Sequence, residues 1–310
     1  MNALPAENGH ITPLSGGFIV FLTVIFGANT VAIKLALTGI GPLTAAGLRF
    51  ALAALAITCW ALASGRSLRI RPDQVPQLLI VCIGFTIQLC LFYLGLDRTY
   101  ASRGVLIANL LPFFVLFLSH RFIPGEAITW NKLVGIVLGF GGVALLFSGS
   151  RGFSASLHSG DVIILAAVTI WSCNVVYTKR IINDYYPFQL VLYPMIFSVP
   201  IFLSAGYFWD GGMIYNLSPV VIGAYVYQSL VSAAFGFVAW NTMLKRFGAS
   251  TLHAFVFIMP IAGVLFSGLL LKEPITPNLI LAMAFIAGGI LMVHMSLKKP
   301  AFTFPLGRGL

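Results

Sequence analysis

The chain is poor in charged residues, and this scarcity excludes most classes of protein. Asp, Glu, Lys and Arg make up 8% of its 310 residues, whereas a typical soluble domain is about one quarter charged. Apolar residues reach 59% and the mean hydropathy is +0.98, so no soluble fold could bury so much apolar surface. Lipid must therefore be part of the solvent, and we predict an all-α integral membrane protein.

Acidic residues and cysteines are also few. The eight acidic residues are scattered singly over the predicted loops, so they offer no cluster of the kind that a membrane enzyme builds around a metal or a nucleophile. The four cysteines lie inside apolar stretches without metal-ligand spacing. We therefore predict no catalytic residues, no metal and no cofactor, and a polytopic enzyme acting on lipid-linked substrates is a less favoured alternative.

Ten apolar stretches are each close to the roughly twenty residues needed to cross a bilayer. Residues with turn chemistry, such as Gly41-Pro42, Pro187 and Pro219, separate them. We place the spans near residues 18–35, 43–63, 76–96, 101–121, 131–149, 160–180, 187–208, 219–241, 250–271 and 278–297. Residues 1–17 lack Lys and Arg, so we predict that they form an N-terminal tail and not a cleavable signal. Residues 298–310 form a C-terminal tail.

Basic residues are distributed unequally between the two sides of the predicted membrane. With the N-terminus inside, twelve lie on the inner side: Arg66, Arg69, Arg71, Arg121, Lys132, Lys179, Arg180, Lys245, Arg246, Lys298, Lys299 and Arg308. Five lie on the outer side: Lys34, Arg98, Arg103, Arg151 and Lys272. The positive-inside rule then predicts cytoplasmic termini in an inner membrane, and it explains the net charge of +10 without nucleic acid.

The sequence nearly repeats itself with an offset of about 145 residues. The matches follow the same order in both copies: Asn29 with Asn174, Val31 with Val176, Lys34 with Lys179, Ala101-Ser102 with Ala249-Ser250, Pro112 with Pro260, Glu126 with Glu273, and Gly141-Gly142 with Gly288-Gly289. The repeats cover residues 18–149 and 160–297, with five predicted spans each. Because five is odd, the second copy must enter the membrane from the opposite side, which gives two inverted repeats around a central cavity.

These segments resemble a known family. The stretches that carry the resemblance are FGANTVAIK, PLTAAGLRFALAAL, YLGLDRTYASRGVLIANLLPFF, GEAIT and GFGGV. They are similar to the EamA-type repeat, and two tandem copies are the arrangement of the drug/metabolite transporter superfamily. The resemblance implies ten helices around a central cavity and export of amino acids or other small metabolites. The second copy departs from it at one position, where Pro194 aligns with Arg49.

The predicted function is a secondary transporter that exports small amphiphilic metabolites, most of all amino acids, as a monomer or homodimer. A nucleotide-sugar or lipid carrier is the alternative, although it would need several basic residues facing the cavity. A passive channel or an accessory subunit is a further possibility that the inverted repeat disfavours. No acidic residue lies at the centre of a span, so the proton relay of a typical pump is missing.

Uncharged polar residues inside the spans are candidate substrate ligands, because a buried amide needs a partner on another helix or in a watery cavity. Interhelical hydrogen bonding is the competing interpretation of each. His253 is the candidate whose charge changes near neutral pH. The predicted substrate-binding set is Asn29, Gln88, Asn109, Asn174, Tyr177, Gln228, Trp240 and His253.

Three charged residues have two interpretations each. Arg49 lies about six residues into the second span, so its side chain could extend to the interface or receive a substrate carboxylate. Glu126 and Glu273 each follow a span, where a carboxylate could gate the cavity or bind the free N–H groups of the next helix. We favour the structural interpretation of all three. Gly135, Gly139, Gly142, Gly288 and Gly289 predict close contact between helix backbones.

Overall fold

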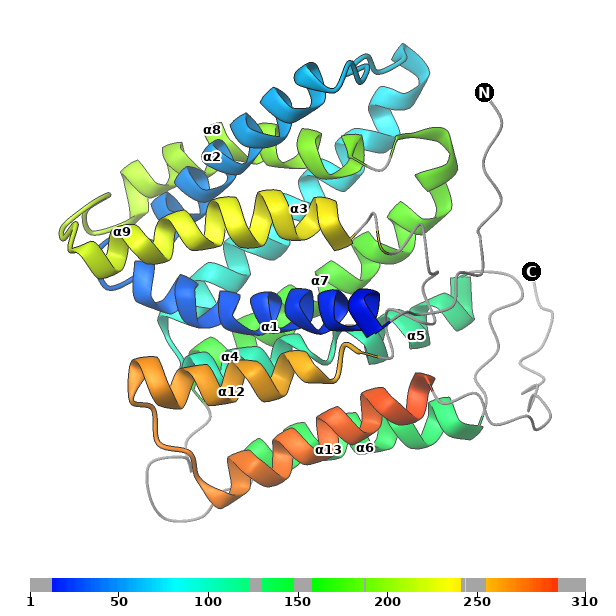
Figure 1. Cartoon of the computed structure of the whole chain (residues 1–310), viewed down its shortest axis with the longest axis vertical. Helices are drawn as coiled ribbons and strands as arrows, with labels where there is room; N and C mark the ends of the chain where they lie inside the picture. The colour runs from blue at the N-terminus through cyan, green and yellow to red at the C-terminus, as the bar shows by residue number, and fades with distance from the viewer. Residues whose placement is uncertain are drawn as a thin grey trace.

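The computed structural model describes residues 13–122, 130–147, 158–186, 188–240, 243 and 255–294. These residues form a bundle of helices (Figure 1), and among them the only β-type pairing is an isolated bridge between Ile40 and Ile214. α1 begins and α13 ends at the same end of the bundle, which we call the terminal end (Figure 1). The other end is called the opposite end. The predicted all-helical class is confirmed.

The helices fall into two halves of the sequence. The first half contains α1 (Pro13–Ala36), α2 (Pro42–Ala63), the short 3-10 helix η1 (Pro72–Gln74), α3 (Val75–Asp97), α4 (Ala101–Ala108), α5 (Leu111–Phe122) and α6 (Trp130–Phe147). The second half contains α7 (Ser159–Ile181), the 3-10 helix η2 (Ile182–Asp184), α8 (Gln189–Trp209), α9 (Pro219–Val226), the π-helix η3 (Tyr227–Gly236), α12 (Ile258–Leu271) and α13 (Pro277–His294).

Seven helical stretches in the described residues are long and apolar enough to cross a membrane. Two of them are composite: α4 with α5 covers Ala101–Phe122, and α9, η3 and the helical residues that follow them cover Pro219–Trp240. Three further apolar helices are shorter, at Trp130–Leu145, Ile258–Leu271 and Pro277–Val293. A multi-pass membrane protein is thereby confirmed, and the count of ten spans stays a prediction.

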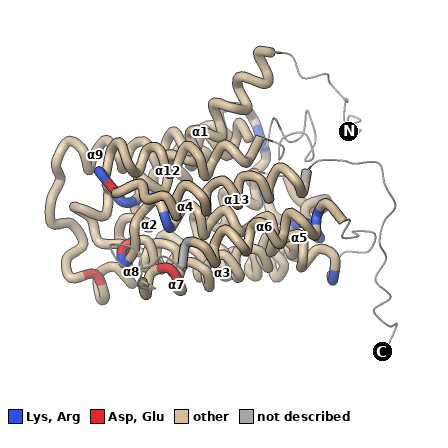
Figure 2. Tube along the Cα trace, turned by 90° about the horizontal axis from the view of Figure 1, so that it is seen from below, with Lys and Arg blue, Asp and Glu red and all other residues tan. Residues whose placement is uncertain are grey.

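Proline determines where several helices begin. Pro42, Pro219 and Pro277 are the first residues of α2, α9 and α13, where the missing N–H is not needed and the fixed φ suits a helix. Between the helix ends, charged residues are few, and Figure 2 shows them gathered mainly toward the two ends of the bundle. The ends therefore face water and headgroups, and the lengths between them suit lipid.

The two halves do not pack as separate bundles. α6 lies along α13, α3 along α7, α2 along α8, and α1 along α12, so each of these close pairs joins one half to the other. A single large cluster of buried apolar side chains includes Ile33 and Phe50 of the first half together with Ile164 and Ile286 of the second. The fold therefore depends on contacts between the halves.

Glycine permits the closest of these contacts. A methyl group on Gly135 of α6 would lie 2.6 Å from the carbonyl oxygen of Gly289, and one on Gly289 of α13 would lie 2.7 Å from that of Gly135. Gly142 and Gly139 are equally crowded, against Ala282 and the ring of Phe113. The predicted close approach is confirmed at these four positions. It is wrong at Gly288, where a methyl group would meet no atom within 4 Å because that position faces away from α6.

Gly288 and Gly289 therefore make a matched test of the helix contact. Gly289→Ala is expected to destabilise the protein by about 1–3 kcal/mol, because a methyl group there can fit only if two backbones separate. Gly288→Ala is expected to be neutral or to stabilise by up to about 1 kcal/mol, since alanine favours a helix over glycine. Thermal unfolding of both variants in detergent measures the difference, and equal midpoints would contradict the packing described.

Candidate functional site

At the opposite end, a carboxylate from the second half binds the start of α2. Asp210, directly after α8, accepts hydrogen bonds from the backbone N of Thr44 at 2.8 Å, from its Oγ1 at 2.7 Å and from the backbone N of Leu43 at 3.3 Å. The first N–H groups of a helix have no partner within it, and their dipoles favour a negative charge. Asp210 thus stabilises the α2 terminus and links it to α8.

Glu273, two residues after the end of α12, does the same for α4. One of its oxygens accepts from the backbone N of Ala101 at 2.7 Å, and the other accepts from the N and Oγ of Ser102 at 2.9 and 2.6 Å. The sequence predicted that Glu273 binds the free N–H groups of the helix that follows it, whereas its described hydrogen bonds come from the start of α4. Its predicted counterpart Glu126 lies outside the described residues.

A third carboxylate, Asp161 in the first turn of α7, forms a buried ion pair. It accepts from Nη2 and Nε of Arg103 at 2.6 and 3.1 Å, and from the hydroxyl of Thr99 at 2.6 Å. The Asp161 side chain is fully buried and that of Arg103 is nearly so. This pair joins α7 of the second half to α4 of the first.

Hydrogen bonds to backbone carbonyls also join the two halves at the opposite end. The N–H of Gly41 donates to Met213 O, and the N–H of Tyr215 donates to Gly39 O, both at 3.0 Å. The Tyr215 hydroxyl donates to Leu37 O at 2.7 Å. Partial burial raises the pKa of Tyr215, helped by the nearby charges of Asp97 and Asp210, so the hydroxyl keeps the proton that it donates.

Deeper in the bundle, three polar side chains form a hydrogen-bonded chain between the halves. Nη1 of Arg49 on α2 donates to the hydroxyl of Tyr93 on α3 at 3.2 Å. That hydroxyl donates to Oε1 of Gln228 on η3 at 2.8 Å. Arg49 is 4% exposed, and Tyr93 and Gln228 are fully buried. We call these three residues the Arg49 triad.

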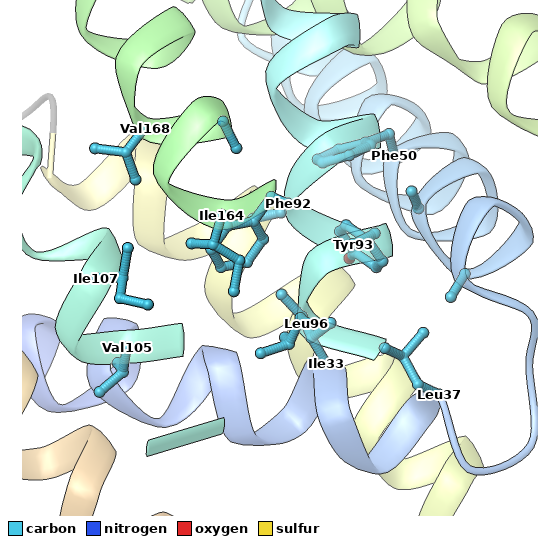
Figure 3. Close-up of a cluster of buried hydrophobic side chains, with 14 of the residues drawn as sticks. Ile33, Leu37, Phe50, Phe92, Tyr93, Leu96, Val105, Ile107, Ile164 and Val168 are labelled. Carbon is cyan, nitrogen blue, oxygen red and sulfur yellow. The ribbon is translucent and has the colours of Figure 1, made fainter. Parts of the chain in front are cut away.

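Apolar side chains surround the triad. Figure 3 shows Tyr93 with Ile33, Leu37 and Leu96 on one side and Phe50 on another. The Arg49 guanidinium carbon lies 5.2 Å from the centre of the Phe50 ring, a cation–π contact. Such surroundings have a low effective dielectric, which strengthens any interaction of the charge with an anion.

The triad leaves hydrogen-bond donors unused. Nε of Arg49 and Nε2 of Gln228 are buried and have no acceptor in the part of the chain that the structure describes. Within the same residues, no Asp or Glu forms an ion pair with Arg49. Arg49 therefore does not extend to the membrane interface, which was one of its two predicted roles, but points into the bundle.

The other predicted binding residues are not gathered into one described cluster. Asn29 and Gln88 each bury a carbonyl oxygen that lacks a described partner. Asn109 donates to Val105 O at 2.8 Å, at the break between α4 and α5. Asn174 lies against α3, since its Nδ2 reaches Val81 O at 3.4 Å.

Aromatic candidates lie at helix contacts. The ring of Trp240 packs edge-on against Phe26 of α1 at 5.8 Å, and Tyr177 packs against the apolar cluster around Cys82 and Tyr185. His253 lies outside the described residues. Within those residues, no group of three His, Cys, Asp or Glu side chains could hold a metal ion.

Sequence reasoning missed the cross-half contacts of Asp161 and Asp210. An Asp within the first turn of a span, as Asp161 is, and a Thr two residues after the helix-starting Pro42 were visible signals of helix-start chemistry. Neither signal identifies its partner, because Asp210 and Thr44 are 166 residues apart in sequence.

Comparison with known proteins gives a consistent result. The sequence pattern of the EamA-like transporter family matches the chain twice, over residues 14–148 and 158–295. An uncharacterized transporter of Archaeoglobus fulgidus is 30% identical over 281 residues, covering 89% of this chain and 97% of that protein. One solved crystal structure has a similar fold, with a TM-score of 0.69 and 19% identity, covering 91% of this chain and 96% of that chain.

Two further relatives have names that include a substrate. A probable amino-acid metabolite efflux pump of Escherichia coli is 27% identical, covering 89% of this chain and 93% of that protein. An S-adenosylmethionine/S-adenosylhomocysteine transporter of Chlamydia trachomatis is 26% identical, covering 89% and 88%.

Proposed function

The chain belongs to the EamA-like transporter family, and on that basis we propose that it exports small amphiphilic metabolites, amino acids above all, as a secondary transporter working by alternating access. The observation that carries the proposal is the packing of the two halves against each other along nearly every close helix pair. Movement of one half against the other around a shared site is how transporters with inverted repeats expose that site to each side in turn.

The helix contacts support two inverted five-helix repeats. In the first half, α1 packs against α12, α9 and η3 of the second half. In the second half, α7 packs against α5, α4 and α3 of the first. Suppose that α1 corresponds to α7, that α4 with α5 corresponds to α12, and that α3 corresponds to α9 with η3. The contacts of α1 with the second half are then the counterparts of the contacts of α7 with the first half. The proposed architecture is ten spans around a central cavity, acting as a monomer or homodimer.

The relatives' names support a substrate with an amino-acid group. Amino acids and both adenosyl compounds carry an α-amino carboxylate, so one recognition chemistry could serve all of them. A nucleotide-sugar carrier is less well supported, because its substrate has several negative charges. Among the described basic residues near the opposite end, Arg103 is neutralised by Asp161 and Lys34 donates to the carbonyls of Leu96 and Asp97.

The solute path is proposed to include uncharged polar residues of both halves. Buried carbonyl oxygens without a described partner at Asn29 and Gln88 support it, since such atoms are rarely left unsatisfied without water or a ligand. The proposed path residues are Asn29, Gln88, Asn109, Asn174, Tyr177, Gln228, Trp240 and His253.

Proteoliposomes containing the purified protein test the function. They would be loaded with labelled amino acids, S-adenosylmethionine or a nucleotide sugar, and release would be compared with that from protein-free vesicles. Protein-dependent release of at least one amino acid is expected. Release of the nucleotide sugar alone would replace the proposed substrate class, and no release of any probe would overturn the function.

The proposed location is the inner membrane with both termini in the cytoplasm. Reporter fusions at residues 17, 70, 155 and 300 are expected to read inside, inside, outside and inside. The physical reason is the excess of Lys and Arg on one side, which holds those segments in the cytoplasm. A periplasmic signal at residue 70 or 300 would contradict both this orientation and the inverted repeat.

A further inference from the structure

We propose that the Arg49 triad is the subsite that binds the carboxylate of the transported solute, and that the solute class is therefore organic molecules with a single carboxylate, with or without an amino group. This inference rests on the proposed transport function and adds the chemical group that is recognised. It follows from three independent features of the triad: its uncompensated charge, the direction of its hydrogen bonds and its position between the halves.

The first feature is a buried charge without a counter-charge. A guanidinium keeps its proton under all ordinary conditions, so Arg49 cannot become neutral when it is buried. It is 4% exposed, and no described Asp or Glu forms an ion pair with it. Burying an unpaired charge is strongly unfavourable, so such a residue is expected to have an anionic partner during its working cycle.

The second feature is that the unused hydrogen-bonding groups of the triad are donors. The guanidinium can only donate, so the Tyr93 hydroxyl accepts from it and uses its own proton toward Gln228. This makes Oε1 the atom of Gln228 that faces Tyr93, and leaves its Nε2 hydrogens unused. With Nε of Arg49 also free of an acceptor, both ends of the chain offer N–H groups. A carboxylate, which accepts through two oxygens, satisfies this pattern, whereas an ammonium group does not.

The size of the charge limits the solute further. The other three buried charged residues in the described part of the chain, Arg103, Asp161 and Glu273, already have partners. One unpaired cation balances one negative charge. The single carboxylate of a monoanion or of a zwitterion supplies that one negative charge, and a diphosphate would exceed it.

The third feature is position. Arg49 and Tyr93 belong to the first half and Gln228 to the second, so an anion held between them contacts both halves. Arg49 also lies five residues, about 7.5 Å along α2, below the Thr44–Asp210 contact at the opposite end. Gln228 lies in the first turn of a π-helix, an irregularity that frequently marks functional sites. Because the triad is buried, a solute reaches it only when the halves move, as alternating access requires.

Binding to purified protein in detergent provides the test, with three probes of similar size that share the same aromatic ring. L-phenylalanine carries both groups, 3-phenylpropanoate lacks the amine, and L-phenylalaninol replaces the carboxylate by a hydroxymethyl group. Dose-dependent thermal stabilisation gives an apparent affinity for each. We expect the two carboxylates to bind and L-phenylalaninol to bind at least roughly tenfold more weakly, since a charge-assisted pair is lost.

Variants tie this preference to the triad. In Arg49→Met, the affinity for both carboxylates is expected to fall at least roughly tenfold, to the level of L-phenylalaninol. Arg49→Lys keeps the positive charge but lacks the planar guanidinium that can donate two parallel hydrogen bonds, so it should give an intermediate affinity. This variant also tests the proposal if Arg49→Met does not fold. Lys34→Met is the matched control, because Lys34 is also basic and partly buried but has its own carbonyl acceptors. It should keep the preference for carboxylates.

Several outcomes would overturn the inference: no stabilisation by either carboxylate, equal binding of L-phenylalaninol, or undiminished carboxylate affinity in Arg49→Met and Arg49→Lys. Failure of the transport function is separate and would appear differently. If the wild type binds carboxylates through Arg49 but proteoliposomes release none of the probes, the carboxylate subsite stands and the exporter proposal falls.

Discussion

Arg103→Met is expected to lower the free energy of unfolding by about 3–5 kcal/mol, because it leaves the Asp161 carboxylate buried without a cation. Asp161 is fully buried and accepts from Arg103 through two nitrogens. Replacing one member of such a pair strongly lowers stability, because the remaining charge is buried without compensation. This loss is far larger than the stability that the intact pair adds compared with apolar side chains in its place. Among the described residues, the Thr99 hydroxyl and the His158 backbone N–H would remain as donors, with His158 Nδ1 3.9 Å from the carboxylate.

Arg49→Met is the matched control for this experiment. Arg49 and Arg103 are both 4% exposed, and they differ in having or lacking a described carboxylate partner. Removing an unpaired buried charge is expected to leave stability unchanged or to raise it. Reversible unfolding in mixed detergent micelles would measure both variants. Equal losses would show that Arg49 also has a structural counter-charge, and no loss in Arg103→Met would refute the importance of the ion pair.

Glu273→Ala is expected to cost about 2–4 kcal/mol of stability, because three donors at the start of α4 lose their acceptor. Glu273→Gln should lose about half as much. Its amide keeps one acceptor oxygen, but its NH2 group would face a backbone N–H that needs an acceptor. The same unfolding experiment orders the three proteins as wild type, Gln and then Ala.

Lys272→Ala provides the control, since Lys272 is exposed and adjacent to Glu273 and should change stability by no more than about 0.5 kcal/mol. If Glu273→Ala is as stable as the control, the carboxylate does not hold α4. A Gln variant that unfolds like the wild type but no longer transports would instead identify Glu273 as a gate.

The sequence was informative about Arg49 but not about its partners. A basic residue inside an apolar span is rare enough to be noticed, and both of its possible roles could be written down from its depth. Gln228 is in the predicted substrate-binding set, but nothing in the sequence pairs it with Tyr93, which lies 135 residues away. That they meet Arg49 depends on the rotation of α2, α3 and η3, for which the hydropathy pattern carries no signal.

The glycines show the same limit on a smaller scale. Five glycines in α6 and α13 predicted close contact, and the neighbours Gly288 and Gly289 could not be distinguished by composition. The structure separates them, because consecutive residues of a helix point about 100° apart and only Gly289 faces α6.

By itself, the sequence determined that this protein lies in a membrane and that it belongs to a two-repeat transporter family. It also determined the positions of most of the membrane spans along the chain. These properties are local: each apolar segment must be a helix in lipid whatever its neighbours are, because its backbone groups have no other hydrogen-bond partners. The tertiary structure decided which helices touch, and so placed Glu273 at the start of α4, Asp161 on Arg103 and Gln228 beside Tyr93. Lipid tails are as apolar as the side chains they contact, so hydrophobicity does not select one helix partner over another. That selection is made by the fit of small residues and by polar contacts between helices, which exist only once the bundle has formed.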